Sequence, residues 1–236
     1  MTGETESAAA GVSDTPEAIV EATYRALCRH GYADLTMQDI ADESDKSKAS
    51  LHYHFDTKED LLLAFLDHLY DSFTEEFETT EGDNAVDRLV TFVDEILCQS
   101  DQDETDGAGA AESADDEVTF EDFQTALLEI KAQGPYVQAY REQLARVDAF
   151  VRERVREIIV DGIEDGDIRA DVDPDDTADF VATLVDGVNT RRVAIGDSEG
   201  STRNVFVEYV RENLVAEDAT IVVSADELGA VPEAED

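Results

Sequence analysis

Apolar residues recur every three or four positions along most of this chain, a spacing that places them on one face of an α-helix. The clearest run lies between Val137 and Ile159, where most apolar residues follow this spacing. Glycine, proline or a helix-capping residue separates each run from the next. The sequence therefore predicts an all-α fold of about nine helices.

Two of the predicted helices are short and lie close together in the sequence. Thr36 and Asp39 have the spacing of a capping box, which opens a helix that ends near residue 43. After a turn, Ser47 can cap a second helix over residues 48–54. Two short helices joined by a tight turn are typical of a helix-turn-helix, whose second helix reads base edges in the major groove of DNA.

Longer helices are predicted on both sides of this pair. A first helix, over residues 14–30, stops at Gly31, and Thr57 and Asp60 form a second capping box that opens a helix to about Phe77. The remaining helices are expected over 86–97, 120–133, 137–159, 175–195 and 202–215, with a loop over 162–174.

Some segments have too few large apolar residues to pack. We expect a disordered N-terminus over 1–13, a solvated acidic insertion over 101–117 and an acidic tail over 217–236. The resulting domains are a DNA-binding domain over 14–60 and a ligand-binding and dimerisation domain over 61–216. Cys28 and Cys98 lack the spacing of a metal site, so neither a metal nor a cofactor is expected.

The net charge of −42 would ordinarily argue against a nucleic-acid partner. However, acidic residues are spread over the whole chain, as in proteins adapted to concentrated salt, where a Debye length of about 3 Å screens long-range repulsion. Three of the four lysines fall between residues 46 and 58, together with His52 and His54. This local cluster predicts phosphate contacts. Because the chain has neither an apolar leader nor a membrane-spanning run, a cytoplasmic location is expected.

The segment from Leu35 to Leu62 resembles the DNA-binding domain of the TetR family of one-component repressors. Residues that fit the family's pattern are Thr36, Ile40, Ala41, Ser47, Lys48, Leu51, Phe55, Lys58, Glu59 and Leu61. Two positions depart from it, since Asp45-Lys46 replaces the usual Gly-Val and His52 replaces a tyrosine that contacts phosphate.

The resemblance implies a non-enzymatic, ligand-responsive repressor that binds an inverted-repeat operator in double-stranded DNA as a homodimer. Residues expected to face bases are Gln38, Lys48, Ala49, Ser50 and Tyr53. Residues expected to hold the DNA backbone are Thr36, Lys46, Ser47, His52, His54 and Lys58.

Residues 162–174 and the helix after them are similar to the C-terminal domain of the BetI-like branch of that family. By this similarity the last two helices would form the dimer interface through Phe180, Leu184, Val188, Phe206, Tyr209 and Val210, although these residues could equally belong to the core of one subunit. An unknown small-molecule effector would bind in a pocket between the long helices, and aromatic side chains with a few polar groups suit such cavities. The candidate pocket residues are Phe92, Phe120, Phe123, Tyr136, Tyr140 and Asn189.

The sequence also contains partial patterns of other functions. Residues 196–200 match the G-x-S-x-G pattern of hydrolases, but a helix is predicted before them where a strand is needed, and the last histidine is His68. Asp101, Asp103 and Glu112 partly match a calcium loop, with its glycine one place too late. The main alternative is an acidic helical protein that binds a partner and has no DNA affinity, which Asp45 and Asp56 favour.

Overall fold

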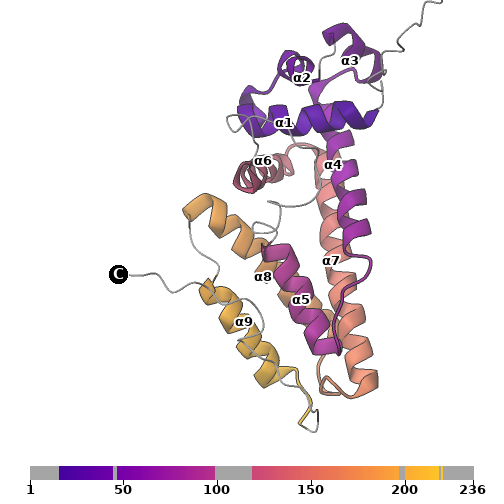
Figure 1. The fold of residues 1–236 in the computed structure, drawn as a ribbon, viewed down its shortest axis with the longest axis vertical. Helices are drawn as coiled ribbons and strands as arrows, with labels where there is room; N and C mark the ends of the chain where they lie inside the picture. The colour runs from indigo at the N-terminus through magenta and orange to yellow at the C-terminus, as the bar shows by residue number, and fades with distance from the viewer. Residues whose placement is uncertain (1–15, 45–46, 99–118, 197–199, 218, 220–236) are drawn as a thin grey trace, which may run out of the picture. The chain divides into compact units, whose positions relative to one another are not determined.

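The computed structural model describes residues 16–44, 47–98, 119–196, 200–217 and 219, and within these ranges it contains nine α-helices (Figure 1). Their bounds are α1 Pro16–Asp34, α2 Met37–Glu43, α3 Lys48–His54, α4 Lys58–Glu76, α5 Ala85–Cys98, α6 Phe120–Gln133, α7 Gln138–Asp165, α8 Pro174–Ile195 and α9 Gly200–Asn213. An isolated antiparallel bridge joins Ile168 to Val215. The all-α prediction is confirmed. The predicted insertion over 101–117 and the segments 1–13 and 220–236 lie outside the described residues.

The chain divides into two compact units, residues 1–65 and 66–236, with the division inside α4. In the first unit, α1 packs against α2, and α2 against α3. The predicted apolar face of α1 is buried, as Ile19, Ala22, Ala26 and Leu27 are each at most 3% exposed. Gly31 interrupts α1 with φ 70°, a left-handed conformation that glycine adopts without steric cost, at the position where the helix was predicted to stop.

In the second unit the long α7 packs against α5, α6 and α8, and α9 packs against α5 (Figure 1). The apolar faces of α5, α7, α8 and α9 form one continuous core, which also includes Phe77, just after α4. Within it, Phe77, Phe92, Val155 and Val181 are at most 1% exposed. Asp167 accepts a hydrogen bond from the amide of Ala85 (3.0 Å), so the turn after α7 caps the start of α5. No helix in the described part of the chain is long and apolar enough to cross a membrane.

The end of α7 differs from the prediction. A loop was expected from Gly162, but the helix continues through this residue and ends at Gly166, whose φ of 83° terminates it. A glycine is required at position 162 by packing, because a Cβ there would lie 2.7 Å from the side chains of both Ala85 and Ile168. The residue therefore marks a close approach between segments and not a helix end.

Candidate functional site

Thr36 and Asp39 fix the start of α2. The Thr36 hydroxyl accepts hydrogen bonds from the amides of Gln38 (3.2 Å) and Asp39 (3.3 Å), and Asp39 Oδ2 accepts one from the Thr36 amide (2.8 Å). The Thr36 hydroxyl also donates to Asp39, and these bonds hold the pKa of the Asp39 carboxyl below its ordinary value. The predicted capping box is therefore present. Because Met37, Ile40 and Ala41 are buried, α2 is held firmly within its unit.

The helix α3 presents almost all of its side chains to solvent. Its N-cap is Ser47, whose hydroxyl accepts a hydrogen bond from the Ser50 amide (3.2 Å), and Leu51 is its only buried residue. Tyr53 is 85% exposed. The other exposed side chains of this helix are Lys48, Ala49, His52 and His54. A two-turn helix with a single anchor and a cationic, small and aromatic surface has the shape and chemistry of a DNA-recognition helix.

The acidic residues of α2 are partly neutralised within the same unit. Glu43 forms ion pairs with Arg25 and Arg29, and Arg25 also donates to the Glu43 carbonyl (3.1 Å) at the end of α2. Gln38 donates to Asp42 (2.7 Å). These partners reduce the negative potential that α2 adds beside α3. The arginines were missed at the sequence level, although their positions four apart on α1 place them on one face.

Lys58 and Lys46 differ from the other predicted backbone contacts. Lys58 is half-buried, and its ammonium donates to the Tyr32 carbonyl (2.9 Å) and lies 4.8 Å from the centre of the Tyr32 ring. This contact ties the start of α4 to the end of α1. Lys46 and its neighbour Asp45 lie outside the described residues.

The candidate dimer residues divide into two groups. Val188, Phe206 and Val210 belong to the core of the C-terminal unit, with at most 7% of each exposed. Phe180 is 43% exposed, and its ring lies 4.9 Å from that of Tyr209, which is half-buried like Leu184. Phe180, Leu184 and Tyr209 thus leave apolar surface on α8 and α9.

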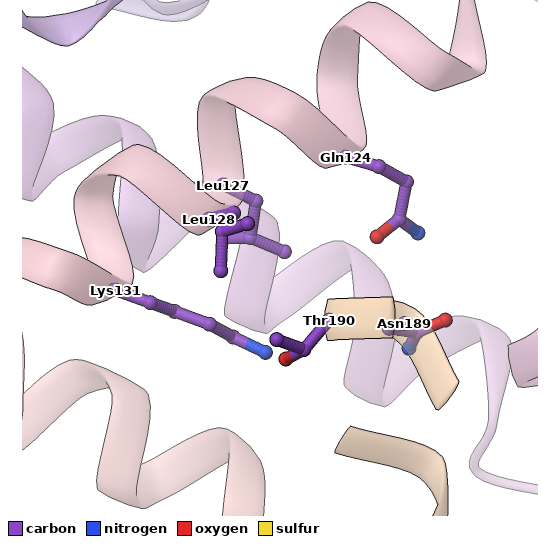
Figure 2. Close-up of a pocket in the computed structure, with 6 residues that line it drawn as sticks. All are labelled: Gln124, Leu127, Leu128, Lys131, Asn189 and Thr190. Carbon is purple, nitrogen blue, oxygen red and sulfur yellow. The ribbon is translucent and has the colours of Figure 1, made fainter. Parts of the chain in front are cut away.

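The candidate pocket residues are not gathered in one place. Phe92 and Tyr140 are core residues, Tyr136 is 84% exposed, Phe123 is half-buried and the side chain of Phe120 lies outside the description. Asn189 lines a small hollow between α6 and α8 (Figure 2). Its other lining residues are Gln124, Leu127, Leu128, Lys131 and Thr190. These five residues are not among those that the sequence predicts for the pocket. The spacing of Gln124, Leu128 and Lys131 is a possible signal, because it places two polar residues and one apolar residue on the same face of a helix.

Features of the rival functions are not assembled in the described part of the chain. Residues 196–200 connect α8 to α9, so the G-x-S-x-G pattern follows a helix, as predicted, and not a strand. The described residues hold no group of three or more metal-binding side chains. The partial calcium loop at 101–112 lies outside them.

Comparisons with known proteins agree with the geometry. Residues 19–65 match "Bacterial regulatory proteins, tetR family", and residues 108–219 match "BetI-type transcriptional repressor, C-terminal". A solved TetR transcription regulator from Haloarcula marismortui is 37% identical, with a TM-score of 0.72, and the match covers 84% of this chain and 97% of that one.

Two further relatives extend the comparison. A structure described as a putative transcriptional regulator from Saccharomonospora viridis in complex with choline is 25% identical, with a TM-score of 0.66, over 86% of this chain and 98% of that one. The regulator TtgR of Pseudomonas putida is 32% identical over 76 residues, which are 32% of this chain and 36% of TtgR. The chain thus spans about a third of the length of the curated relatives it matches. All are named as regulators and not as enzymes.

Proposed function

Because the chain belongs to the TetR family of transcriptional regulators, we propose that it is a repressor that binds an inverted-repeat operator as a homodimer and releases it in response to a small molecule. The observation that carries the proposal is the surface of α3. Apart from Leu51 and the half-buried Ser50, its side chains are exposed, and no described acidic residue forms an ion pair with Lys48. Such a helix is available to enter the major groove.

Within this function, the α3 residues divide by position. The residues proposed to face bases on α3 are Lys48, Ala49, Ser50 and Tyr53. Gln38 of α2 is proposed to do so as well, after its side-chain amide gives up its hydrogen bond to Asp42 and donates to a base instead. The N-cap residues Thr36 and Ser47 begin helices whose first amides favour a phosphate. Residues proposed to contact the DNA backbone are Thr36, Lys46, Ser47, His52, His54 and Lys58.

Dimerisation is proposed through α8 and α9. The surface formed by Phe180, Leu184, Val205 and Tyr209 is apolar, with Val205 62% exposed, and a second copy of the chain would remove it from water. A twofold dimer would also place two recognition helices about one DNA turn apart, which is the spacing that an inverted repeat requires. Val188, Phe206 and Val210 would support this surface from the core.

The remaining features are proposed from composition and relatives. The Saccharomonospora regulator was solved in complex with choline, which supports a response to a small molecule. The acidic composition, together with the similarity to a Haloarcula protein, supports a halophilic cytoplasm as its setting.

Footprinting with the full chain at high potassium concentration tests the proposal, first on DNA upstream of its own gene and then on fragments of the whole genome. We expect a protected inverted repeat, with one half-site for each subunit. A matched variant, Lys48→Ala, should retain the fold and lose protection. If no fragment is protected, the repressor proposal is wrong and the alternative of an acidic partner-binding protein is favoured.

A further inference from the structure

We propose that the hollow between α6 and α8 binds the head group of a small neutral molecule that both donates and accepts hydrogen bonds, such as a carboxamide or an alcohol. This inference rests on the proposed ligand response and specifies its chemistry. Its basis is the juxtaposition of two carboxamide side chains, Gln124 of α6 and Asn189 of α8, beside two leucines (Figure 2).

One of the two carboxamides has a buried atom without a partner among the described residues, and the other has no hydrogen bond to them. Gln124 is only 8% exposed, and its side chain makes no hydrogen bond with the described part of the chain. The Oδ1 atom of Asn189 is buried and receives no hydrogen bond from a described residue. Buried polar atoms without partners are uncommon in native proteins because their desolvation is unfavourable, so each such atom requires a physical reason. A ligand that donates to Asn189 Oδ1 supplies that reason, and the Gln124 carboxamide lines the same hollow, where it can form a second hydrogen bond to the ligand.

The charges at the hollow favour a neutral head group over an ionic one. Lys131 is the only charged lining residue, and its ammonium lies 2.6 Å from Asp186 Oδ1, so the pair cancels. A carboxylate would have to displace Asp186, and an ammonium would lie beside Lys131 without a lining carboxylate. A neutral head group avoids both costs.

The remaining lining fixes the size and orientation of the ligand. In this structure the hollow has a volume of about 10 Å³, roughly the space needed by one water molecule. Leu127 and Leu128 supply an apolar wall on α6, against which a short alkyl chain can pack. Entry of anything larger than water must separate α6 from α8 at this point. Because α8 also carries Phe180 and Leu184, ligand entry would displace the helix that forms the proposed dimer surface.

The test uses three probes with one carbon skeleton: propionamide, propionate and propylammonium. Saturation-transfer NMR with the full chain, at fixed high potassium chloride concentration, detects weak binding of each without requiring DNA. We expect saturation transfer to propionamide at concentrations where the two ions show none. Gln124→Met and Asn189→Leu should each weaken propionamide binding by about tenfold, the usual effect of one lost hydrogen bond. The control Gln133→Met makes the same change on α6 away from the hollow and should leave binding unchanged.

Several outcomes would overturn the inference. Stronger transfer to either ion would exclude a neutral head group, and unchanged propionamide binding in both pocket variants would place the site elsewhere. Absence of transfer to all three probes would mean that the hollow holds at most a structural water. Operator binding by the same proteins, measured without probe, distinguishes these failures from a failure of the repressor proposal, because a chain that binds DNA but not propionamide contradicts only the ligand class.

Discussion

Adding one methyl group at Gly162 tests the packing of the C-terminal unit most directly. A Cβ at this position in α7 would lie 2.7 Å from Ala85 Cβ and 2.7 Å from Ile168 Cδ1, far inside van der Waals contact. The end of the Ile168 side chain can rotate away, but the Cβ of Ala85 is fixed by the backbone of α5. The start of α5 would therefore move away from α7, and we expect Gly162→Ala to destabilise the protein.

The magnitude follows from three contributions. Replacing glycine by alanine within a helix stabilises by about 1 kcal/mol. Overpacking of a filled site costs about 1 to 3 kcal/mol, and displacement of Ala85 also weakens its 3.0 Å hydrogen bond to Asp167, which costs about 1 kcal/mol more. The net loss is about 1 to 3 kcal/mol. For a chain of this size it corresponds to a fall in Tm of roughly 2 to 12 °C.

Thermal unfolding followed by far-UV circular dichroism, at one protein and one salt concentration, measures this loss. Ile168→Val serves as the matched second change, because it removes one of the two side-chain atoms nearest the added Cβ. Ile168→Val should lower the stability of the Gly162→Ala protein by less than it lowers the stability of the unmodified protein, and a double-mutant cycle detects this difference. A Gly162→Ala protein with an unchanged or higher Tm would refute the role assigned to this glycine.

Three other predictions concern contacts elsewhere in the chain. Lys48→Ala should weaken operator binding about tenfold or more, as measured by fluorescence anisotropy, because a well-placed DNA contact contributes about 1 to 3 kcal/mol. Replacing either Arg203 or Asp94 by alanine should cost about 2 to 4 kcal/mol in urea unfolding, because their bidentate pair (2.8 and 2.6 Å) joins α9 to α5 with side chains only 11% and 17% exposed. Acidification should loosen α2, as measured by amide hydrogen exchange: Thr36 lowers the pKa of Asp39, so this stabilisation is present above the ordinary value of 3.8 and is lost as the pH falls through the lowered pKa.

Each of these predictions has its own control. The Lys48→Ala protein should keep its unfolding curve, and loss of fold would contradict the assignment of this residue to an exposed surface. Arg88→Ala breaks the more exposed pair with Asp161 and should cost less than about 1 kcal/mol, so equal losses at the two pairs would contradict the argument from burial. Asp39→Asn should remove the loss of protection factors in α2 on acidification. If these protection factors still fall with pH in the variant, another titrating group is responsible.

Features that depend on a few neighbouring residues could be predicted from the sequence. The capping boxes at Thr36 and Thr57 are present, since the Thr57 hydroxyl accepts from the Asp60 amide (3.1 Å) as the Thr36 hydroxyl does from Asp39. The N-cap at Ser47 and the stop at Gly31 are local in the same sense. A cap joins residues two or three positions apart, so its partners can be read directly from the sequence.

Features that depend on distant segments could not be predicted in this way. The sequence predicts a helix end at Gly162 because a glycine often stops a helix, whereas the residues that require this glycine, Ala85 and Ile168, come from two other segments. The candidate pocket residues lie apart for a similar reason: Phe92 belongs to a core that uses the same residue types as a cavity. Only the packing of α6 against α8 brings Gln124 and Asn189 together.

The charge around α3 leads to a last prediction, on the salt dependence of operator binding. A basic DNA-binding protein releases the counterions of the phosphates it neutralises, so its affinity falls by about 10³ to 10⁵ between 50 and 200 mM salt when it makes six to ten such contacts. Here Lys48 is the only exposed lysine among the described residues of the DNA-binding unit, and exposed acids such as Asp56 lie close to it in the sequence.

Counterion release by the proposed lysine contacts is therefore opposed by the acidic residues, which must be screened by cations before the two surfaces can meet. The two effects oppose each other, so we expect the affinity for operator to change less than about tenfold, or to rise, as potassium chloride increases toward multimolar concentration. Asp56→Asn removes one repulsive charge. It should therefore make the affinity for operator fall more steeply with salt concentration, as it does for a basic DNA-binding protein. Fluorescence anisotropy over a potassium chloride series measures both slopes. A steep loss of affinity with salt in the unmodified protein would mean that phosphate contacts dominate, and the balance of charge inferred around α3 would then be wrong.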